Sequence, residues 1–252
     1  MLETHELSVR FGGHVAVDAV SCAFAPGTLT AIVGPNGAGK TTYFNLISGQ
    51  LRASGGAVRL GGRDLSRLDA PARARAGLGR AFQLTQLFGQ LSVLENVRLA
   101  VQARAGLGLR LLSSWRAHRA LLDEAMAILE RVRLAPRAGA AAASLPHGDQ
   151  RKLEVAVLMA MRPQVYLFDE PTAGMSVDEV PVVLELIREL KREGGHTILL
   201  VEHKMDVVRE LADRIVVLHQ GRVVADGAPA AVIAAPIVQQ AYLGTAPVEE
   251  LA

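Results

Sequence analysis

Apolar and polar positions follow two different rhythms along this chain. Short runs of four or five apolar residues are typical of strands that are covered on both faces. Such runs, two of which include a threonine, occur at residues 29–33, 165–168 and 197–201. Each run is followed by a segment in which apolar residues recur three or four positions apart, as in amphipathic helices. Short apolar strands that alternate with helices predict a mainly parallel sheet with helices on both faces.

Antiparallel strands are expected at two places beside this sheet. Residues 7–10 and 15–24 alternate in strand fashion around a glycine-containing turn, which predicts an N-terminal hairpin. Residues 215–218 and 222–225 flank the turn Gln220-Gly221 and predict a second pair. Both pairs are expected to lie at the flanks of the parallel sheet.

A block in the middle of the chain is predicted to contain helices only. Apolar positions at helical spacing indicate helices that begin near Ser92, Trp115 and Asp149, and the Ala-rich residues 138–143 are left as a linker. We therefore predict an α/β core with an N-terminal antiparallel β subdomain, formed by residues 1–84 and 163–252. Residues 85–162 are predicted to form an inserted helical subdomain.

A glycine-rich segment lies between the first apolar strand and the helix that follows it. Residues 34–42, Gly-Pro-Asn-Gly-Ala-Gly-Lys-Thr-Thr, fit the pattern G-x-x-x-x-G-K-[ST]. In this context, backbone N–H groups and the positive end of the helix dipole form a cradle for phosphate. Lys40 is expected to reach the β- and γ-phosphates, and the Thr41 hydroxyl to bind Mg²⁺. The other residues of the cradle are Gly34, Pro35, Asn36, Gly37, Ala38, Gly39 and Thr42.

Two acidic residues follow the second apolar strand. Asp169 is expected at the carboxyl end of this strand, where open α/β sheets bind their ligands, and it can hold Mg²⁺ through water. Glu170 can orient the attacking water or accept its proton. The structural alternative is that this segment only caps a helix. GTPases are disfavoured, because no Asn of the chain is followed by Lys, as the guanine-reading motif Asn-Lys-x-Asp requires.

These motifs, with three more in the same order, resemble the ATP-binding subunits of ABC transporters along the whole chain. The additional motifs are Gln83, the signature segment at residues 145–150, and His203 at the end of the third apolar strand. The resemblance implies a P-loop NTPase fold and hydrolysis of ATP with Mg²⁺. It implies that the Gln83 amide contacts the metal and the water, and that His203 contacts the γ-phosphate and orients Glu170. It also places the aromatic ring that stacks on adenine at Phe11.

The signature segment departs from the family pattern. In the family, this segment reaches across a dimer to the γ-phosphate held by a second cassette. Here Pro146 stands where a serine is usual, and Pro has neither a hydroxyl nor an N–H group. The expected binding residues are Ser144, Pro146, His147, Gly148 and Asp149, and we hypothesise that His147 supplies a replacement donor. Ser176 also stands where the family usually has Asp, in the loop through which the two cassettes communicate.

Within the family, several segments look like the branched-chain amino acid importers. They are residues 11–13, 34–37, 44–49 and 172–176 and the ending Ala241-Tyr242-Leu243-Gly244. The resemblance implies as partners a second ATP-binding subunit, identical or a sister chain, multi-span permease subunits and, indirectly, a solute-binding protein. Closely similar subunits serve urea, short amides and aromatic acids, because the membrane subunits and the binding protein choose the solute.

Composition bears on where the protein is located and on what it binds. The net charge of +2 predicts no bulk attraction to nucleic acid or anionic lipid, and the single cysteine, Cys22, fits a reducing compartment. The N-terminus shows no secretory signal, and no apolar run approaches the length of a membrane span. We expect a peripheral protein on the cytoplasmic face of the cell membrane, bound through permease subunits.

Two further classes of function are weighed against transport. A soluble ABC-type ATPase that acts on nucleic acid or the ribosome would usually carry two cassettes, a long coiled coil or a basic extension, and this chain shows none of these. A small-molecule kinase would leave the signature segment and the sequence Glu170-Pro171-Thr172 unexplained.

Overall fold

A computed structural model of the chain describes residues 1–81, 87–107 and 119–243, with side chains as far as Gln239. Its strands are β1 (Leu2–Phe11), β2 (His14–Phe24), β3 (Leu29–Val33), β4 (Gly55–Leu60), β5 (Arg63–Asp64), β6 (Leu78–Ala81), β7 (Val165–Asp169), β8 (Thr197–Val201), β9 (Arg214–His219) and β10 (Arg222–Gly227). Its helices are α1 (Lys40–Ser48), α2 (Ala70–Arg75), α3 (Val93–Arg104), α4 (Arg119–Arg131), α5 (His147–Met161), α6 (Val180–Glu193), α7 (Met205–Leu211), α8 (Pro229–Ala234) and α9 (Pro236–Leu243).

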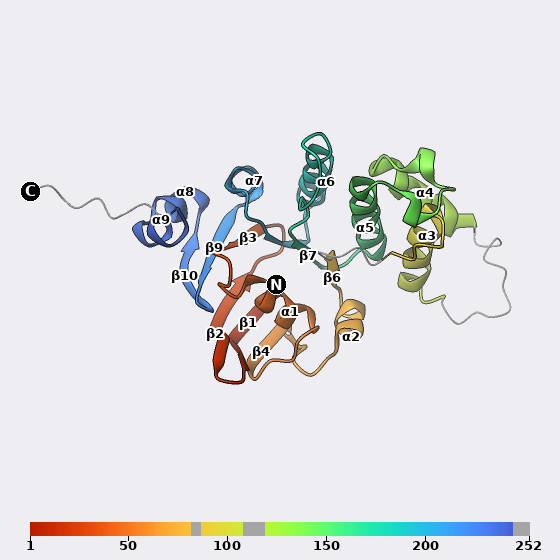
Figure 1. Cartoon of the computed structure of the whole chain (residues 1–252). Helices are drawn as coiled ribbons and strands as arrows, with labels where there is room; N and C mark the ends of the chain where they lie inside the picture. Colours follow the sequence, from red (N-terminus) through yellow and green to blue (C-terminus); the bar gives the residue numbers. More distant parts are fainter. Residues whose placement is uncertain (82–86, 108–118, 244–252) are drawn as a thin grey trace, which may run out of the picture.

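A central sheet organises these elements. In the described part of the chain it has the strand order β10-β9-β3-β8-β7-β6. Neighbouring strands from β9 to β6 are parallel, and only β10 runs antiparallel to its neighbour β9. Every residue of β3, β7 and β8 is buried, which confirms the interpretation of their apolar runs as strands covered on both faces. Figure 1 shows α6 and α7 on one side of this sheet, and α1 with the N-terminal strands on the other.

Side-chain alternation along the central strands supplies a separate hydrophobic core to each face. On β7, Tyr166 and Phe168 pack with residues of α5 and α6, whereas Val165 and Leu167 pack with residues of α1 and the N-terminal strands. A smaller core joins β3 and β9 to α7, α8 and α9, with Val208 and Val232 among its members. Because successive side chains of a strand point to opposite faces, an all-apolar strand serves both cores at once.

The N-terminal strands form a second, antiparallel sheet. Its order in the described residues is β2-β1-β4-β5, and Phe11 pairs with His14 where the hairpin closes. The sheet is tied to α1 by a buried hydrogen bond of 2.8 Å between the hydroxyls of Thr4 and Tyr43. The predicted hairpin is confirmed. The short strand β5 was not predicted, since two exposed residues carry no alternation to reveal it.

Helices α3, α4 and α5 stand together at one side of the molecule (Figure 1). Helix α3 begins after Ser92, whose hydroxyl accepts a hydrogen bond from the Glu95 amide at 3.1 Å. Helix α5 begins at His147, two residues before the predicted start, because Pro146 takes the N-cap position and its ring suits the start of a helix. The predicted start of the second helix near Trp115 lies outside the described residues, and α4 is seen from Arg119. The subdomain limits at residues 84/85 and 162/163 stay a prediction.

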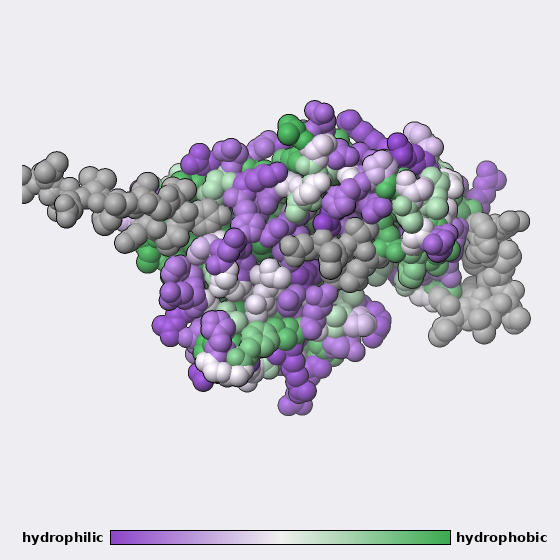
Figure 2. Space-filling view, viewed as in Figure 1, coloured by the Kyte–Doolittle hydropathy of each residue, from purple (hydrophilic) through white to green (hydrophobic). Residues whose placement is uncertain are grey.

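The face of the molecule seen in Figure 2 is largely polar. In the view of Figure 2, hydrophilic side chains cover most of the molecule and hydrophobic ones gather in small separate areas. Within residues 1–81, 87–107 and 119–243, every helix is too short or too polar to cross a lipid bilayer.

A buried arginine holds the end of α1. Arg73 of α2 is 3% exposed, and its guanidinium donates hydrogen bonds to the carbonyl oxygens of Leu46 at 2.6 Å, Ile47 at 2.7 Å and Leu68 at 3.0 Å. The last carbonyls of a helix have no partner within the helix, so Arg73 satisfies groups that would otherwise be buried without one. Burial lowers the pKa of Arg73.

We expect Arg73→Met to lower the free energy of unfolding by about 2–4 kcal/mol, because several buried carbonyls lose their donor at once. Urea unfolding followed by circular dichroism measures this. The control is Arg75→Met on the same helix, where the side chain is exposed and a change below about 0.5 kcal/mol is expected. Equal losses for the two variants would contradict the role of Arg73.

Candidate nucleotide-binding site

The phosphate loop connects β3 to α1. Gly34, Gly37 and Gly39 all have positive φ, of 152°, 79° and 98°, so the loop needs glycine at these positions. Gly34 is also required for lack of space, because a Cβ there would lie 2.1 Å from the carbonyl oxygen of Leu218. The loop therefore passes close against the end of β9 and delivers the chain to the N-terminus of α1. The first amides of a helix have no partner within it and are available to an anion.

Lys40 is the first residue of α1 and is largely buried. Its ammonium donates hydrogen bonds to the carbonyl oxygens of Gly34 at 2.8 Å and Pro35 at 3.0 Å. An ammonium has three N–H donors, so these two bonds hold the side chain over the loop and leave one donor for a ligand. Burial lowers the pKa of Lys40, and the nearby carboxylates of Glu170 and Asp169 oppose this effect.

A cavity of about 390 Å³ opens over the loop. It unites residues from the hairpin, the loop and two strand ends, and its walls are Phe11, His14, Ala16, Asn36, Gly37, Ala38, Gly39, Lys40, Thr41, Thr42, Glu170 and His203. Phe11 is 51% exposed, and an exposed aromatic side chain that lines a cavity can accept a planar base. The cavity thus combines an exposed aromatic side chain with the glycine-rich loop and the Lys40 ammonium.

Strand order brings Glu170 and His203 into contact. Strand β8 lies between β3 and β7, so the residues after β7 and β8 emerge beside the phosphate loop. Glu170 Oε1 lies 2.7 Å from His203 Nε2. The backbone of Glu170 has φ of 52°, a conformation uncommon for a residue with a side chain and often found at functional sites.

Behind this pair lies a buried carboxylate that the sequence did not single out. Glu202 is 3% exposed. It accepts hydrogen bonds from the Thr172 hydroxyl and, at 2.9 Å, from the His203 amide. Glu202 therefore links the segment after β7 to the segment after β8. The sequence holds one signal for Glu202: it is an acidic residue directly after the apolar run 197–201. A charge that is buried in such a place needs partners.

The two oxygens of Asp169 have different surroundings. Oδ2 accepts a hydrogen bond of 2.6 Å from Arg80 of β6. Oδ1 is buried and accepts no hydrogen bond from the residues that the structure describes. A buried carboxylate oxygen without a donor is costly unless a ligand completes it, and a hydrated divalent cation is suited to do so. In the described chain no three His, Cys, Asp or Glu side chains form a metal cluster, so Mg²⁺ would depend on Asp169, the Thr41 hydroxyl and the nucleotide.

The signature segment lies away from this cavity. His147 and Gly148 form the first turn of α5, and a Cβ on Gly174 would lie 3.2 Å from His147 Cε1. Gly148 lies against the carboxylate of Glu179, since a Cβ on it would come 2.0 Å from Glu179 Oε1. Glu179 Oε2 in turn accepts a hydrogen bond from the Ser176 amide at 3.1 Å, a capping arrangement that the pattern S-x-x-E at 176–179 could have revealed.

Other residues predicted to bind the nucleotide lie outside the cavity or outside the described part of the chain. Asp149 forms ion pairs with Lys152 at 2.8 Å and Arg137 at 3.3 Å, and the Ser144 hydroxyl donates to the Ala141 carbonyl at 2.7 Å. Neither lines the nucleotide cavity. Gln83 lies outside the described residues.

Comparisons with known proteins find relatives along nearly the whole chain. The family model for the ABC transporter matches residues 17–173. The high-affinity branched-chain amino acid transport ATP-binding protein LivG of Escherichia coli K12 is 40% identical over 251 residues, 98% of each chain. BraF of Pseudomonas aeruginosa, described in the same words, is 38% identical over 252 residues, again 98% of each chain. A nucleotide-free ATP-binding cassette from an ABC transporter matches with a TM-score of 0.82 at 28% identity, over 97% of this chain and 99% of that one.

The chain belongs to the ABC transporter family. It is an ATP-binding subunit of this family and hydrolyses ATP, which confirms the fold and the class of enzyme expected from the motifs. The match extends over nearly the full length of LivG and BraF.

We expect Gly34→Ala to weaken ATP binding at least tenfold, because the new Cβ would force the loop away from the Leu218 carbonyl. Titration with a fluorescent ATP analogue measures this. The control is Gly27→Ala, a turn glycine with φ of 76° and open space around it, which should bind ATP within about twofold of the unaltered chain. Unchanged affinity in Gly34→Ala would show that the loop does not need this close approach.

Proposed function

We propose that this chain energises an importer of branched-chain amino acids, working in pairs around two ATP molecules on the cytoplasmic face of the membrane. The assignment of the solute rests on a single observation, the full-length similarity to LivG and BraF. Both are named for branched-chain amino acid transport. The site geometry supports the ATP chemistry, and the known relatives favour transport over the alternative of a nucleic-acid or ribosome ATPase.

ATP is held by groups from the N-terminal hairpin and from the phosphate loop. The adenine ring stacks on Phe11, and the phosphates lie in the loop from Gly34 to Thr42, where the N-terminus of α1 and the Lys40 ammonium stabilise their charge. Because Lys40 is already anchored to two loop carbonyls, little conformational entropy is lost when its ammonium contacts the phosphates.

Hydrolysis requires a water that is oriented against the γ-phosphate. The Glu170 carboxylate is positioned to accept a proton from this water, and the contact with His203 fixes the carboxylate's orientation. The Glu202 bonds fix His203 in turn by its backbone. Asp169, Thr41 and, from the family pattern, Gln83 would hold Mg²⁺, which would neutralise charge on the phosphates when bound.

One chain provides only half of the surroundings of the γ-phosphate. The signature residues on α5 do not line the cavity of their own chain, which agrees with a site that a second cassette completes. The amides of Gly148 and Asp149 at the N-terminus of α5 remain for the phosphate, and His147 is the candidate donor in place of the usual serine. Closure of the pair excludes water and stabilises the phosphate charge from both sides, and hydrolysis removes the bridging group.

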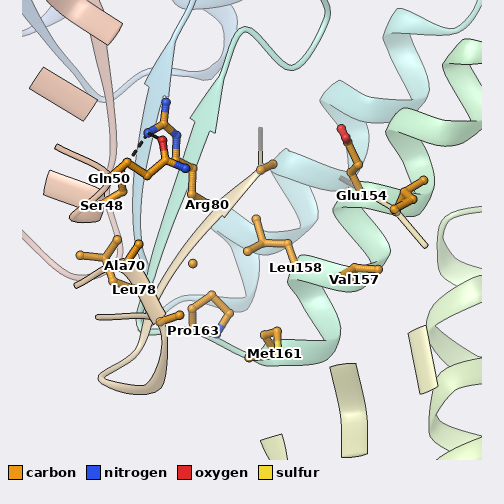
Figure 3. A pocket seen from close by; sticks show the side chains of 14 residues that line it. Ser48, Gln50, Ala70, Leu78, Arg80, Glu154, Val157, Leu158, Met161 and Pro163 are labelled. Carbon is orange, nitrogen blue, oxygen red and sulfur yellow. Dashed lines mark hydrogen bonds between the residues drawn. The ribbon is translucent and has the colours of Figure 1, made fainter. Parts of the chain in front are cut away.

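A second pocket is suited to the permease. It has a volume of about 200 Å³ and lies between α2 and β6 on one side and α5 on the other (Figure 3). Its wall is largely apolar, with Ala74, Leu78, Leu158 and Met161 among the lining residues, and the carboxylate of Glu154 marks one end. Such a pocket fits an amphipathic helix, which a membrane subunit would extend into the cytoplasm. Because it joins the core to α5, docking there would move the signature segment relative to the phosphate loop.

Leucine uptake tests the proposal. The chain is reconstituted into liposomes with its permease subunits and binding protein, and ATP-dependent uptake of radiolabelled leucine is measured. Glu170→Gln should lower both ATP hydrolysis and uptake at least a hundredfold and leave ATP affinity within about twofold, because the carboxamide cannot accept the proton. Competition by valine and isoleucine, but not by urea or short amides, is expected. Normal ATP hydrolysis with uptake of another solute would contradict the solute assignment alone.

The docking pocket is tested separately with Ala74→Trp. Ala74 is exposed on α2 and lines the pocket, so an indole there should fill it without unfolding the protein. We expect loss of at least tenfold in the ATPase stimulation that the permease provides, with the basal ATPase of the isolated chain unchanged. The control is Ala120→Trp, at an exposed position of α4. Normal stimulation in Ala74→Trp would place the permease elsewhere.

A further inference from the structure

Arg80 is buried between the nucleotide site and the docking pocket, and no sequence motif pointed to it. Its side chain is 7% exposed, and that of Asp169 is 1% exposed. Strand β6 pairs with β7 with Arg80 opposite Leu167, so the arginine lies two residues before the register position of Asp169. A long side chain can span this offset, and its guanidinium reaches the carboxylate at the carboxyl end of the neighbouring strand.

The guanidinium binds two parts of the nucleotide site at once. Nη2 donates to Asp169 Oδ2 at 2.6 Å. Nη1 donates to Asn45 Oδ1 at 2.7 Å, Ser48 Oγ at 2.9 Å and Gln50 Oε1 at 3.0 Å, and the last of these bonds is drawn in Figure 3. Asn45 and Ser48 belong to α1, the helix that begins at Lys40. Arg80 therefore joins the helix of the phosphate loop to the strand that carries Asp169.

These bonds set the direction in which Asp169 can act. Arg80 occupies Oδ2 only, and the buried Oδ1 is left without a donor from the described residues. A carboxylate held at one oxygen by a rigid, planar guanidinium cannot rotate freely, so the other oxygen keeps one orientation. The guanidinium charge is itself shared among several oxygen acceptors, which reduces its repulsion of a nearby cation.

We propose that Arg80 is a positioning residue that presents Oδ1 of Asp169 to the Mg²⁺ of the bound nucleotide. This inference rests on the proposed ATPase mechanism. A cationic side chain so close to a metal site has two opposite effects on the Mg²⁺ concentration that the site requires, and the geometry decides which one dominates. Orientation of the carboxylate lowers the Mg²⁺ concentration that is needed, whereas bare repulsion would raise it. The single-oxygen contact favours orientation, so loss of Arg80 raises the Mg²⁺ requirement.

The test compares Arg80→Gln, Arg80→Lys and the control Arg98→Gln in the full chain. Arg98 on α3 is equally buried, with a side chain 6% exposed and an ion pair to Glu95 at 2.8 Å, but it lies away from the nucleotide cavity. Two quantities are measured: ATP affinity in EDTA, and the affinity of the ATP complex for Mn²⁺, followed by electron paramagnetic resonance. The Mg²⁺ concentration for half-maximal ATPase is measured alongside.

Arg80→Gln is expected to weaken Mn²⁺ binding and raise the half-maximal Mg²⁺ concentration about tenfold, with metal-free ATP affinity within about twofold. Arg80→Lys keeps the charge but not the forked geometry, so its Mn²⁺ affinity and half-maximal Mg²⁺ concentration should lie between those of Arg80→Gln and the unaltered chain. This variant also tests the proposal if Arg80→Gln fails to fold. Arg98→Gln should leave all three quantities unchanged. Unchanged or tighter metal binding in both Arg80 variants would overturn the proposal. Absence of Mg²⁺-dependent hydrolysis in the unaltered chain would instead overturn the proposed function.

Discussion

The parallel pairing of β8 with β3 on one side and with β7 on the other is the constraint on which the site depends. It places the phosphate loop, Glu170 and His203 at one edge of the sheet, although the loop precedes the other two by more than a hundred residues in the chain. The three strands are apolar on both faces and hold two cores together, so they cannot shift without exposing both. The chemistry is therefore carried by short segments on the most deeply buried part of the fold.

Opposite charges are brought together at this edge, and each is held by a second contact. Lys40 is anchored to the loop carbonyls, Asp169 to Arg80, and Glu170 to His203. The carboxylates favour the charged form of the Lys40 ammonium, which burial opposes. Such mutual support keeps charged groups ready in a partly buried site, where each alone would be costly. A triphosphate adds negative charge to an arrangement whose cations are already oriented, so little reorganisation is needed on binding.

The elements around the site connect it to the rest of the molecule. Strand β6 carries Arg80 at the boundary between the nucleotide site and the apolar pocket, so one side chain contributes to both. Helix α5 forms the other wall of that pocket and begins with the signature residues His147 and Gly148. The loop after Thr172 packs against these residues through Gly174 and Glu179. The pocket is therefore connected by packed residues to the nucleotide site through Arg80 and to the signature residues through α5.

Local pattern alone determined much of this protein: the apolar strands, the phosphate loop, the acidic pair and the order of the motifs all follow from short stretches of sequence. Helix starts were off by a few residues, as at α5, because caps depend on geometry as well as residue type. Only the tertiary structure decided the roles of Arg80 and Glu202 and the contact of Glu179 with Gly148. Their partners come from other strands or loops, and a lone arginine or glutamate looks the same in sequence whether it is solvated or buried. Strand order and burial, which are long-range properties, select these residues.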